Sequence, residues 1–223
     1  MRFQPWVFSG AIYRMEGSPA EGDLVDVYTS ERQFIARGHY QIGSITVRVL
    51  SFVEEAIDQR WWNARIRAAY RMREALGLAE NPQTTCYRLV HGEGDSLPWL
   101  VVDDRLTALF DKSGGTLPYN AGLGAQDGYL WGEPAKTENP VLENGCLFRV
   151  NWEQGQKTGF FIDQRENREL VRRYAKGRTV LNTFCYTGGF SVYALSGGAV
   201  QVDSVDSSER AVLLAAVNIA LYF

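Results

Sequence analysis

The C-terminal third of the chain alternates strand-like and helix-like segments, and this alternation restricts the fold more than any other feature. Residues 145–223 contain, in order, the strand "CLFRVNW", the loop "EQGQKTGFFIDQ", the helix "RENRELVRRYAKG", the strand "TVLNTF", the turn "CYTGG", the helix "FSVYALSGG", the strand "VQVDSVD" and the apolar helix "SERAVLLAAVNIALYF". Strands that alternate with helices form parallel sheets with helical crossovers. This region is therefore predicted to be an α/β domain.

The turn between the second strand and its helix predicts a ligand site. In an open parallel sheet, ligands bind at the carboxyl ends of the strands, where glycine permits a tight bend and a close approach of the backbone. Gly188 and Gly189 occupy that position, and Asp206 ends the next strand. Because a carboxylate there can accept hydrogen bonds from both ribose hydroxyls, we expect a cofactor that contains a nucleoside.

The identity of the cofactor depends on the spacing of the glycines. A dinucleotide site requires G-x-G-x-x-G, in which the helix N-terminus receives a pyrophosphate. The segment Thr187-Gly188-Gly189-Phe190 lacks the third glycine in register. S-adenosylmethionine carries a sulfonium and an amino acid but no phosphate, so the spacing favours it over NAD. A turn without a ligand is the remaining alternative.

The N-terminal part of the chain is predicted to contain two further domains. Residues 1–53 hold four short β-branched and aromatic runs separated by turn residues, which predicts a small all-β module. A helix from about Asp58 to Leu76 follows, and Gly77 is placed to end it. The segment "TTCYRLVHGEGDSLPWLVVDDR" predicts two strands around a glycine-rich turn, whereas 106–143 shows too little periodicity to assign. We treat 54–144 as a connector helix with a central, β-rich α+β domain.

Two basic clusters stand out in a chain whose net charge is −3. One lies between Gly155 and Arg178, and the other consists of arginines on the predicted connector helix: Arg60, Arg65, Arg67, Arg71 and Arg73. Salt screening limits the reach of distant charges to about 8–10 Å, so a local basic face can bind phosphates on an acidic protein. Each cluster is equally consistent with a solvated helix face.

Composition argues against several other classes of protein. No run approaches the roughly 20 apolar residues that span a bilayer, and the start of the chain lacks a secretory signal. A cytoplasmic protein without a membrane partner is therefore predicted. Cys86, Cys146 and Cys185 show no paired spacing, and the chain has two histidines. Neither a metal site nor a disulfide framework is expected.

Five collinear motifs carry a resemblance to a known family. They are "PWVFSGAI", "YRLVHGEGDSLPWLVVD", "GQKTGFFIDQRENR", "LNTFCYTGGFSVYA" and "VDSVDSSERAV". Together they closely resemble the bacterial S-adenosylmethionine-dependent ribosomal RNA methyltransferases that join an N-terminal PUA domain to a Rossmann-like methyltransferase domain. The best-known member makes 5-methylcytosine in large-subunit ribosomal RNA. The resemblance implies an N-terminal PUA-like barrel, S-adenosylmethionine as cofactor and ribosomal RNA as partner, and leaves open whether two copies form a homodimer.

The resemblance also implies roles for individual residues. The segment Lys157 to Arg165 would lie over the cofactor pocket, and Asp206 would hold the ribose. The expected cofactor-binding residues are Asp163, Gln164, Arg165, Asn182, Phe184, Tyr186, Thr187, Gly188, Gly189, Phe190 and Asp206. Candidate RNA contacts in the basic segment are Lys157, Arg168, Arg172 and Arg173. As alternatives, Asp163 and Glu166 would form a helix capping box, and Phe160 and Phe161 would belong to the core.

Cytosine C5 methylation requires a residue that the resemblance does not place in this chain. Carbon 5 is weakly nucleophilic, so such enzymes add a cysteine thiolate to carbon 6, and the target base must leave its stack. In this family the nucleophilic cysteine and an Asp-Pro-Pro-type loop lie beyond the second strand of the domain. We therefore expect the nucleophile beyond Phe223, assign no catalytic residue here, and expect Cys185 to pack as a small apolar residue.

The apolar last helix leads to a further expectation, that the chain is a fragment of a longer protein. Parallel sheets are covered on both faces, and two or three strands with apolar helices cannot achieve this. Two alternatives to a methyltransferase remain. One is an RNA-binding module without catalysis, and the other is a nucleotide-dependent oxidoreductase with an RNA-binding-like β module.

Overall fold

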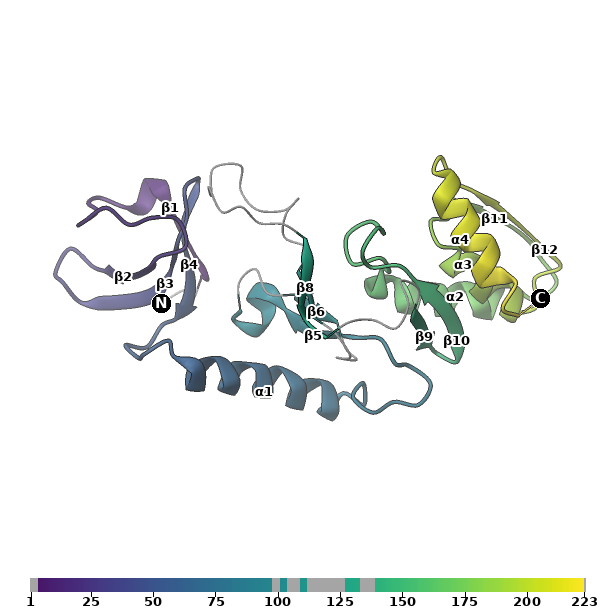
Figure 1. Ribbon diagram of the computed structural model, residues 1–223, viewed down its shortest axis with the longest axis horizontal. Helices are drawn as coiled ribbons and strands as arrows, with labels where there is room; N and C mark the ends of the chain where they lie inside the picture. The colour runs from purple at the N-terminus through teal and green to yellow at the C-terminus, as the bar shows by residue number, and fades with distance from the viewer. Residues whose placement is uncertain (1–3, 98–100, 104–108, 112–126, 133–138, 223) are drawn as a thin grey trace. The chain divides into compact units, whose positions relative to one another are not determined.

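The computed structural model describes residues 4–97, 101–103, 109–111, 127–132 and 139–222, and its elements are drawn in Figure 1. The chain divides into two compact units. The first contains β1 (Trp6–Phe8), β2 (Leu24–Tyr28), β3 (Phe34–Tyr40), β4 (Ile45–Ser51), α1 (Gln59–Ala75), β5 (Arg88–His91) and β6 (Val101–Asp103). The second contains Leu78–Tyr87 and the elements from β8 (Gly128–Trp131) onward, and β8 pairs with β7 (Leu109–Asp111).

The first unit begins with the all-β module that the sequence predicts. Its four strands form one antiparallel sheet in the order β1-β4-β3-β2. Gly38 allows β3 and β4 to approach closely, because a Cβ there would lie 2.1 Å from the carbonyl oxygen of Arg48. Most side chains of β4 are buried, and Val47, Val49 and Leu50 are among its buried apolar residues. The prediction of a small β domain at the N-terminus is confirmed.

Helix α1 follows the predicted bounds within one residue. Asp58 caps it by accepting hydrogen bonds from the backbone N–H groups of Arg60 and Trp61, both at 2.9 Å. Gly77, at φ 67°, follows the last turn, where a left-handed residue normally ends a helix. The buried face of the helix carries Trp61, Ala69 and Arg73.

A tight hairpin opens the part of the second unit that holds the candidate site. Strands β9 (Asn139–Glu143) and β10 (Cys146–Val150) pair antiparallel in unbroken register. Asn144 and Gly145 join them with φ values of 49° and 76°, and positive φ at both positions is the requirement of a type I′ turn. The predicted domain boundary between residues 144 and 145 falls inside this turn, and both strands belong to the same compact unit.

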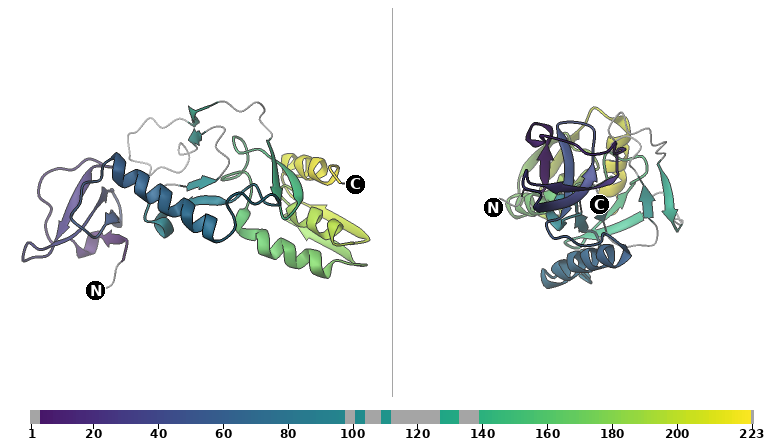
Figure 2. Two further views of the ribbon diagram at one scale, coloured as in Figure 1. Left: turned by 90° about the horizontal axis from the view of Figure 1, so that it is seen from below. Right: turned by 90° about the vertical axis from the view of Figure 1, so that its left-hand side faces the viewer.

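The predicted α/β order is present in the rest of the unit. It consists of α2 (Arg165–Tyr174), β11 (Thr179–Thr183), α3 (Gly189–Ser196), β12 (Gln201–Val205) and α4 (Glu209–Ile219). Strands β11 and β12 pair in parallel, and α3 connects them (Figure 2). Val192, Tyr193 and Ala194 of α3 have no exposed surface, as expected for a helix that is apolar on all sides.

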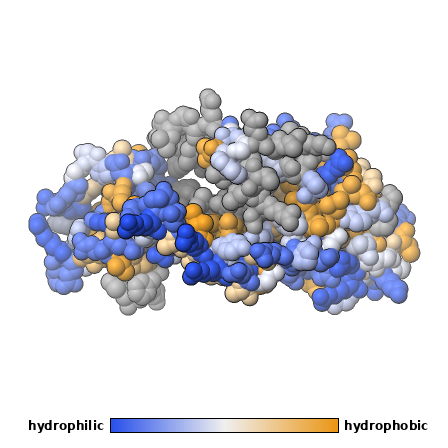
Figure 3. All heavy atoms as spheres, turned by 60° about the horizontal axis from the view of Figure 1, so that its bottom comes forward, coloured by the Kyte–Doolittle hydropathy of each residue, from blue (hydrophilic) through white to orange (hydrophobic). Residues whose placement is uncertain are grey.

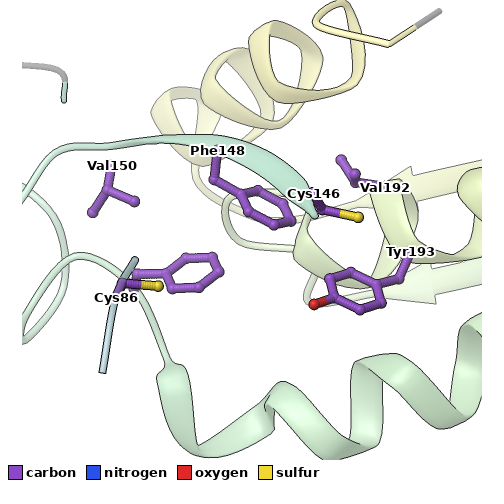
Figure 4. Close-up of a cluster of buried hydrophobic side chains, with 7 residues drawn as sticks. Cys86, Cys146, Phe148, Val150, Val192 and Tyr193 are labelled. Carbon is purple, nitrogen blue, oxygen red and sulfur yellow. The ribbon is translucent and has the colours of Figure 1, made fainter. Parts of the chain in front are cut away.

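A cluster of buried side chains packs α3 against the β9–β10 hairpin (Figure 4). Phe148 of β10 is its centre, with ring centroids 5.1 Å from Phe160 and 6.2 Å from Tyr193. The other members are Cys86, Cys146, Val150 and Val192. Asn218 of α4 ties the helix to this core, because its side chain bonds both backbone groups of Arg149 and the carbonyl of Thr187. The core therefore holds in place the strand ends where the ligand is expected.

A buried ion pair lies beside this core. Glu143, which has no exposed surface, accepts hydrogen bonds from Arg168 at 2.7 and 2.8 Å through its two carboxylate oxygens. Arg165 adds a bond at 3.2 Å, and the Tyr193 hydroxyl donates to the same carboxylate at 3.1 Å. The network joins the end of β9 to α2 and α3.

The expectation that the last helix leaves apolar side chains in water is met. Leu213 of α4 is 62% exposed, and Leu181 and Val205 on the open face of the β11–β12 pair are 65% and 53% exposed. Figure 3 shows hydrophobic residues gathered over this C-terminal part of the surface. Among the helices of the described residues, none combines the length and the hydropathy of a membrane span.

We predict that Glu143→Gln lowers the free energy of unfolding by about 3–5 kcal/mol, because it leaves the Arg168 guanidinium buried without its counter-charge. Urea unfolding followed by circular dichroism measures the change. The matched variant Glu80→Gln changes an exposed carboxylate and is expected to stay within about 0.5 kcal/mol of the parent. Equal stabilities of the two variants would contradict the role given to the Glu143–Arg168 pair.

Candidate ligand-binding site

A cavity of about 740 Å³ lies in the second unit at the carboxyl ends of β11 and β12. This volume is within the usual range of sites for small molecules and cofactors. Four segments line it: the loop after β10, the start of α2, the turn after β11, and the turn and first residues of α4 after β12. Its walls combine aromatic rings with a few polar side chains, which is typical of such sites.

The turn after β11 has a strained backbone. Phe184, Tyr186 and Gly188 all have left-handed conformations, with φ values of 58°, 46° and 76°. This conformation is uncommon for bulky residues and persists where surrounding contacts determine it. The sequence pattern places the bend at the glycines, whereas in the structure it begins four residues before Gly188, at Phe184.

Asp206 holds this turn in place from the end of β12. Its Oδ2 accepts a hydrogen bond from the Tyr186 N–H, and its Oδ1 accepts one from the Ser208 N–H, both at 2.9 Å. The Ser208 N–H, followed by the Tyr186 N–H, lowers the pKa of this carboxyl below its usual value. A carboxylate has about four acceptor positions, so Asp206 keeps capacity to bind hydroxyl groups of a ligand at the cavity.

The two glycines have different functions in the structure. A Cβ on Gly188 would lie 2.9 Å from the Cβ of Ala215, so Gly188 allows the start of α3 to pack against α4. Gly189 lines the cavity, and a Cβ there would meet the Cδ of Arg168 at 3.1 Å. Gly188 therefore allows two helices of the protein to approach each other, and Gly189 brings the backbone close to the cavity.

Tyr186 connects the turn to the loop over the cavity. Its hydroxyl accepts a hydrogen bond from the Gln156 N–H at 2.9 Å and donates one to the Gly159 carbonyl at 3.2 Å. Its ring contacts Phe161 edge to face at 5.3 Å between centroids. Gly155 leaves room for the hydroxyl, because a Cβ there would lie 3.0 Å from it.

Most of the predicted cofactor-binding residues meet at the cavity. Those that line it are Gln164, Phe184, Tyr186, Thr187, Gly189, Phe190 and Asp206. Asp163, Arg165, Asn182 and Gly188 do not line it. The Arg165 side chain bonds Glu143 and the Cys86 carbonyl instead, and Asn182 donates to Ser191 at 2.7 Å.

The expected capping box at the start of α2 is wrong. The N-cap residue is Gln164, without a side-chain cap, and Asp163 lies in a short 3-10 turn, Ile162–Gln164, that precedes the helix. The Asp163 carboxylate accepts a hydrogen bond from the side chain of Gln164 at 3.1 Å. Phe160 is buried in the core, as one alternative predicted, whereas Phe161 is half-buried at the cavity.

The structure corrects one of the four candidate RNA contacts. Arg168 is 3% exposed and paired with Glu143, so its guanidinium is an interior group beneath the cavity and not a surface contact. Arg172 is half-buried, bonded to Glu169 at 2.9 Å and stacked on Tyr193. Lys157 and Arg173 are exposed.

Sequence reasoning missed the lining residues that follow Asp206 and those of the loop after β10. They are Asn151, Gln154, Gly155, Gln156, Ser207, Ser208, Arg210, Ala211 and Leu214. A signal was present for the residues that follow Asp206, because Ser208 is a typical helix N-cap residue and caps α4 by accepting a hydrogen bond from the Ala211 N–H. The first turn of a helix that follows a parallel strand lies at the same sheet edge as the site.

The three cysteines are buried free thiols. Burial raises the pKa of Cys86 to about 11, and it also raises the pKa values of Cys146 and Cys185. A raised pKa disfavours the thiolate, which is the nucleophilic form. The prediction that Cys185 packs as a small apolar residue is consistent with its burial beside the cavity.

Comparison with family models identifies one domain at each end of the chain. Residues 1–52 match the model of a PUA-like domain, and residues 122–217 match that of an S-adenosylmethionine-dependent methyltransferase. The chain thus has an N-terminal PUA-like domain and a C-terminal S-adenosylmethionine-dependent methyltransferase fold.

The curated relatives carry the name ribosomal RNA large subunit methyltransferase I. The protein of that name from Aeromonas hydrophila is 36% identical over 99% of this chain and 63% of its own length, and the one from Tolumonas auensis is 37% identical with the same coverage. The chain therefore spans about 63% of the length of these relatives. Among solved structures, a methyltransferase-like protein from Streptococcus mutans shares the fold, with a TM-score of 0.77 and 23% identity over 97% of this chain and 62% of its own.

We predict that Tyr186→Phe loosens the loop over the cavity. The variant removes the hydroxyl that joins Gln156 to Gly159, and the expected loss of stability is about 1–3 kcal/mol. Hydrogen exchange at the Gln156 amide should become faster. The control is Tyr174→Phe, because Tyr174 is 71% exposed. Equal exchange rates of the Gln156 amide in the two variants would show that the Tyr186 hydroxyl does not hold the loop.

We further predict that the folded protein resists alkylation by iodoacetamide at pH 8. For Cys86, a pKa of about 11 in place of an ordinary value near 8.5 reduces the thiolate fraction on the order of a hundredfold. Mass spectrometry of peptides from folded and guanidinium-unfolded samples measures the rate at each cysteine. Rapid modification of Cys185 in the folded sample would instead support a nucleophilic function for that residue.

Proposed function

We propose that this chain, which joins a PUA-like domain to the fold of an S-adenosylmethionine-dependent methyltransferase, binds S-adenosylmethionine in the cavity after β11 and β12 and belongs to an enzyme that methylates large-subunit ribosomal RNA. The single observation that carries the proposal is the position of Asp206. It follows β12, lines the cavity and keeps free acceptor positions. A carboxylate at this place suits the two hydroxyls of a ribose.

The rest of the cavity fits a cationic methyl donor. Phe161, Phe184, Tyr186 and Phe190 line it, and aromatic faces attract organic cations. The guanidinium of Arg168 at its base is paired with Glu143 at 2.7 Å, which reduces the positive charge that it presents to a sulfonium. S-adenosylmethionine, when bound, supplies an electrophilic methyl group.

The finer proposal is that the product is 5-methylcytosine, as the resemblance of the five motifs implies. That reaction needs a thiolate to attack carbon 6 of the base. The chain has three cysteines, and burial raises the pKa of each of them. A buried thiol with a raised pKa is a poor nucleophile, so we do not assign that role to any of these three cysteines.

The ribosomal RNA partner is inferred from the names of the relatives and from the PUA-like domain. Lys157 and Arg173, both exposed in the second unit, remain proposed RNA contacts, as does the half-buried Arg172. Asp163, Arg165, Asn182 and Gly188 do not line the cavity, so we do not propose them as direct cofactor contacts. Action on ribosomal RNA is consistent with a cytoplasmic protein.

Calorimetric titration with S-adenosylmethionine and with NAD tests the proposal. We predict that S-adenosylmethionine binds at one site and that Asp206→Asn weakens it about 10–100-fold, the loss expected for hydrogen bonds to a charged group. The matched control is Asp203→Asn, three residues earlier on β12 and outside the cavity lining. Thermal melting of both variants checks the turn that Asp206 supports. Binding of NAD without S-adenosylmethionine would replace the methyltransferase with an oxidoreductase.

A further inference from the structure

Helix α1 presents a row of arginines on the side opposite its buried face. Arg60, Arg67 and Arg71 are exposed, and they follow one another at spacings of seven and four residues, which places them along one stripe of an α-helix. The buried residues Trp61, Ala69 and Arg73 lie on the opposite side. Figure 3 is turned so that the side on which Figure 1 shows α1 faces the viewer. Hydrophilic residues cover much of the surface in this region.

The other two arginines of the helix have partners within the first unit. Arg73 is buried and forms a two-point ion pair with Asp95, with both N–O distances at 2.6 Å. Arg65 lies 3.9 Å from Glu55 and stacks over the ring of Trp61. Within the described part of the chain, by contrast, no ion pair is formed by Arg60, Arg67 or Arg71.

The arrangement of the three exposed arginines opposes the stability of the helix that carries them. Arg60 lies in the first turn, where the helix dipole favours acidic residues, and α1 has none there. Arg67 and Arg71 are four residues apart, a spacing at which like charges repel. A helix face that is merely solvated would gain from alternating charges at this spacing, so the stripe is better explained by an external anion.

We propose that this stripe, defined as Arg60, Arg67 and Arg71, binds the phosphate backbone of the RNA substrate. The proposal rests on the proposed function in taking RNA as the partner, and it adds a surface outside both the PUA-like sheet and the cofactor cavity. Guanidinium groups bind phosphate through paired hydrogen bonds. Asn63, Ala64 and Ala68 are small exposed residues of the same helix, and they leave the backbone of a nucleic acid free to approach the arginines.

The charge of the whole chain makes this surface more distinctive. The chain carries a net charge of −3, so a general attraction to RNA is not expected from composition. A stripe that spans three turns of one helix can neutralise neighbouring phosphates because screening confines the effect of distant acidic groups. The expected contacts are with phosphates, so the stripe contributes affinity and register without reading bases.

The test compares two double variants with the same change of charge. Arg67→Gln with Arg71→Gln removes two charges from the stripe, and Lys176→Gln with Arg178→Gln removes two exposed charges from the second unit. Binding of a short fluorescein-labelled polyuridine is measured by anisotropy between 0.1 and 1 M salt, which are about the limits over which counterion release is resolved. A third variant, Arg67→Lys with Arg71→Lys, keeps the charge.

Loss of two phosphate contacts lowers the slope of log affinity against log salt by about 1.4, which corresponds to about 25-fold weaker binding at 0.1 M salt if the curves meet at 1 M. We expect this for the glutamine variant of α1, near-parental binding for the lysine variant, and a smaller loss for the Lys176 and Arg178 variant. The melting temperature of the glutamine variant should be unchanged or slightly raised, since it removes a repulsion.

Equal losses in the two glutamine variants would overturn the proposal, because net charge alone would then explain them. Unchanged binding by the α1 variant would also overturn it, as would equal loss of binding to polyglutamate, which would indicate an acidic protein partner. Titration of the same variants with S-adenosylmethionine separates this inference from the proposed function. If the cofactor binds normally while polyuridine binding is unaffected by the α1 substitutions, the stripe fails and the methyltransferase assignment stands.

Discussion

The buried pair of Glu143 and Arg168 is the constraint on which the geometry of the second unit depends. Two charges removed from water are tolerated only when they are well paired, and here the two carboxylate oxygens of Glu143 accept hydrogen bonds from four donors. Arg168 forms part of the cavity wall. Its guanidinium lies over the ring of Phe160, 4.6 Å from the centroid, and its Cδ packs against the backbone of Gly189, where a Cβ would be too close. The wall of the cavity is therefore fixed by an interaction between β9 and α2 before any ligand is present.

The cavity rim depends on a second constraint, the strained turn after β11. Left-handed conformations at Phe184 and Tyr186 cost free energy, and the backbone N–H that the turn exposes is taken up by Asp206. The Tyr186 side chain uses the same conformation to hold the loop on the other side of the cavity. One residue thus couples the end of β12, the turn and the covering loop. This coupling explains how a site built from separate segments keeps a defined shape.

The sequence predicted the order of elements well, because the signals for it are local. The cap at Asp58, the end at Gly77 and the alternation after residue 145 each depend on a few neighbouring residues. The β9–β10 hairpin was missed although Asn144-Gly145 between alternating apolar residues is a strong turn signal. Ion pairs between residues that are far apart in the sequence could not be predicted. Nothing in the pattern around Glu143 shows that Arg168 lies against it, and for the same reason Arg168 was predicted to be a surface contact for RNA although it is buried.

The arginines show most clearly what sequence patterns leave undetermined. Both basic clusters read alike in the sequence, yet each divides into interior and exposed members. Arg73 and Arg168 meet the carboxylates of Asp95 and Glu143, which are distant in the sequence and buried with them, whereas the exposed members have no such partner placed against them within the described residues. Because a buried arginine requires a specific counter-charge and an exposed one does not, the location of the acidic residues decides which arginines support the fold. Those that remain on the surface without a partner are the ones available to an external anion.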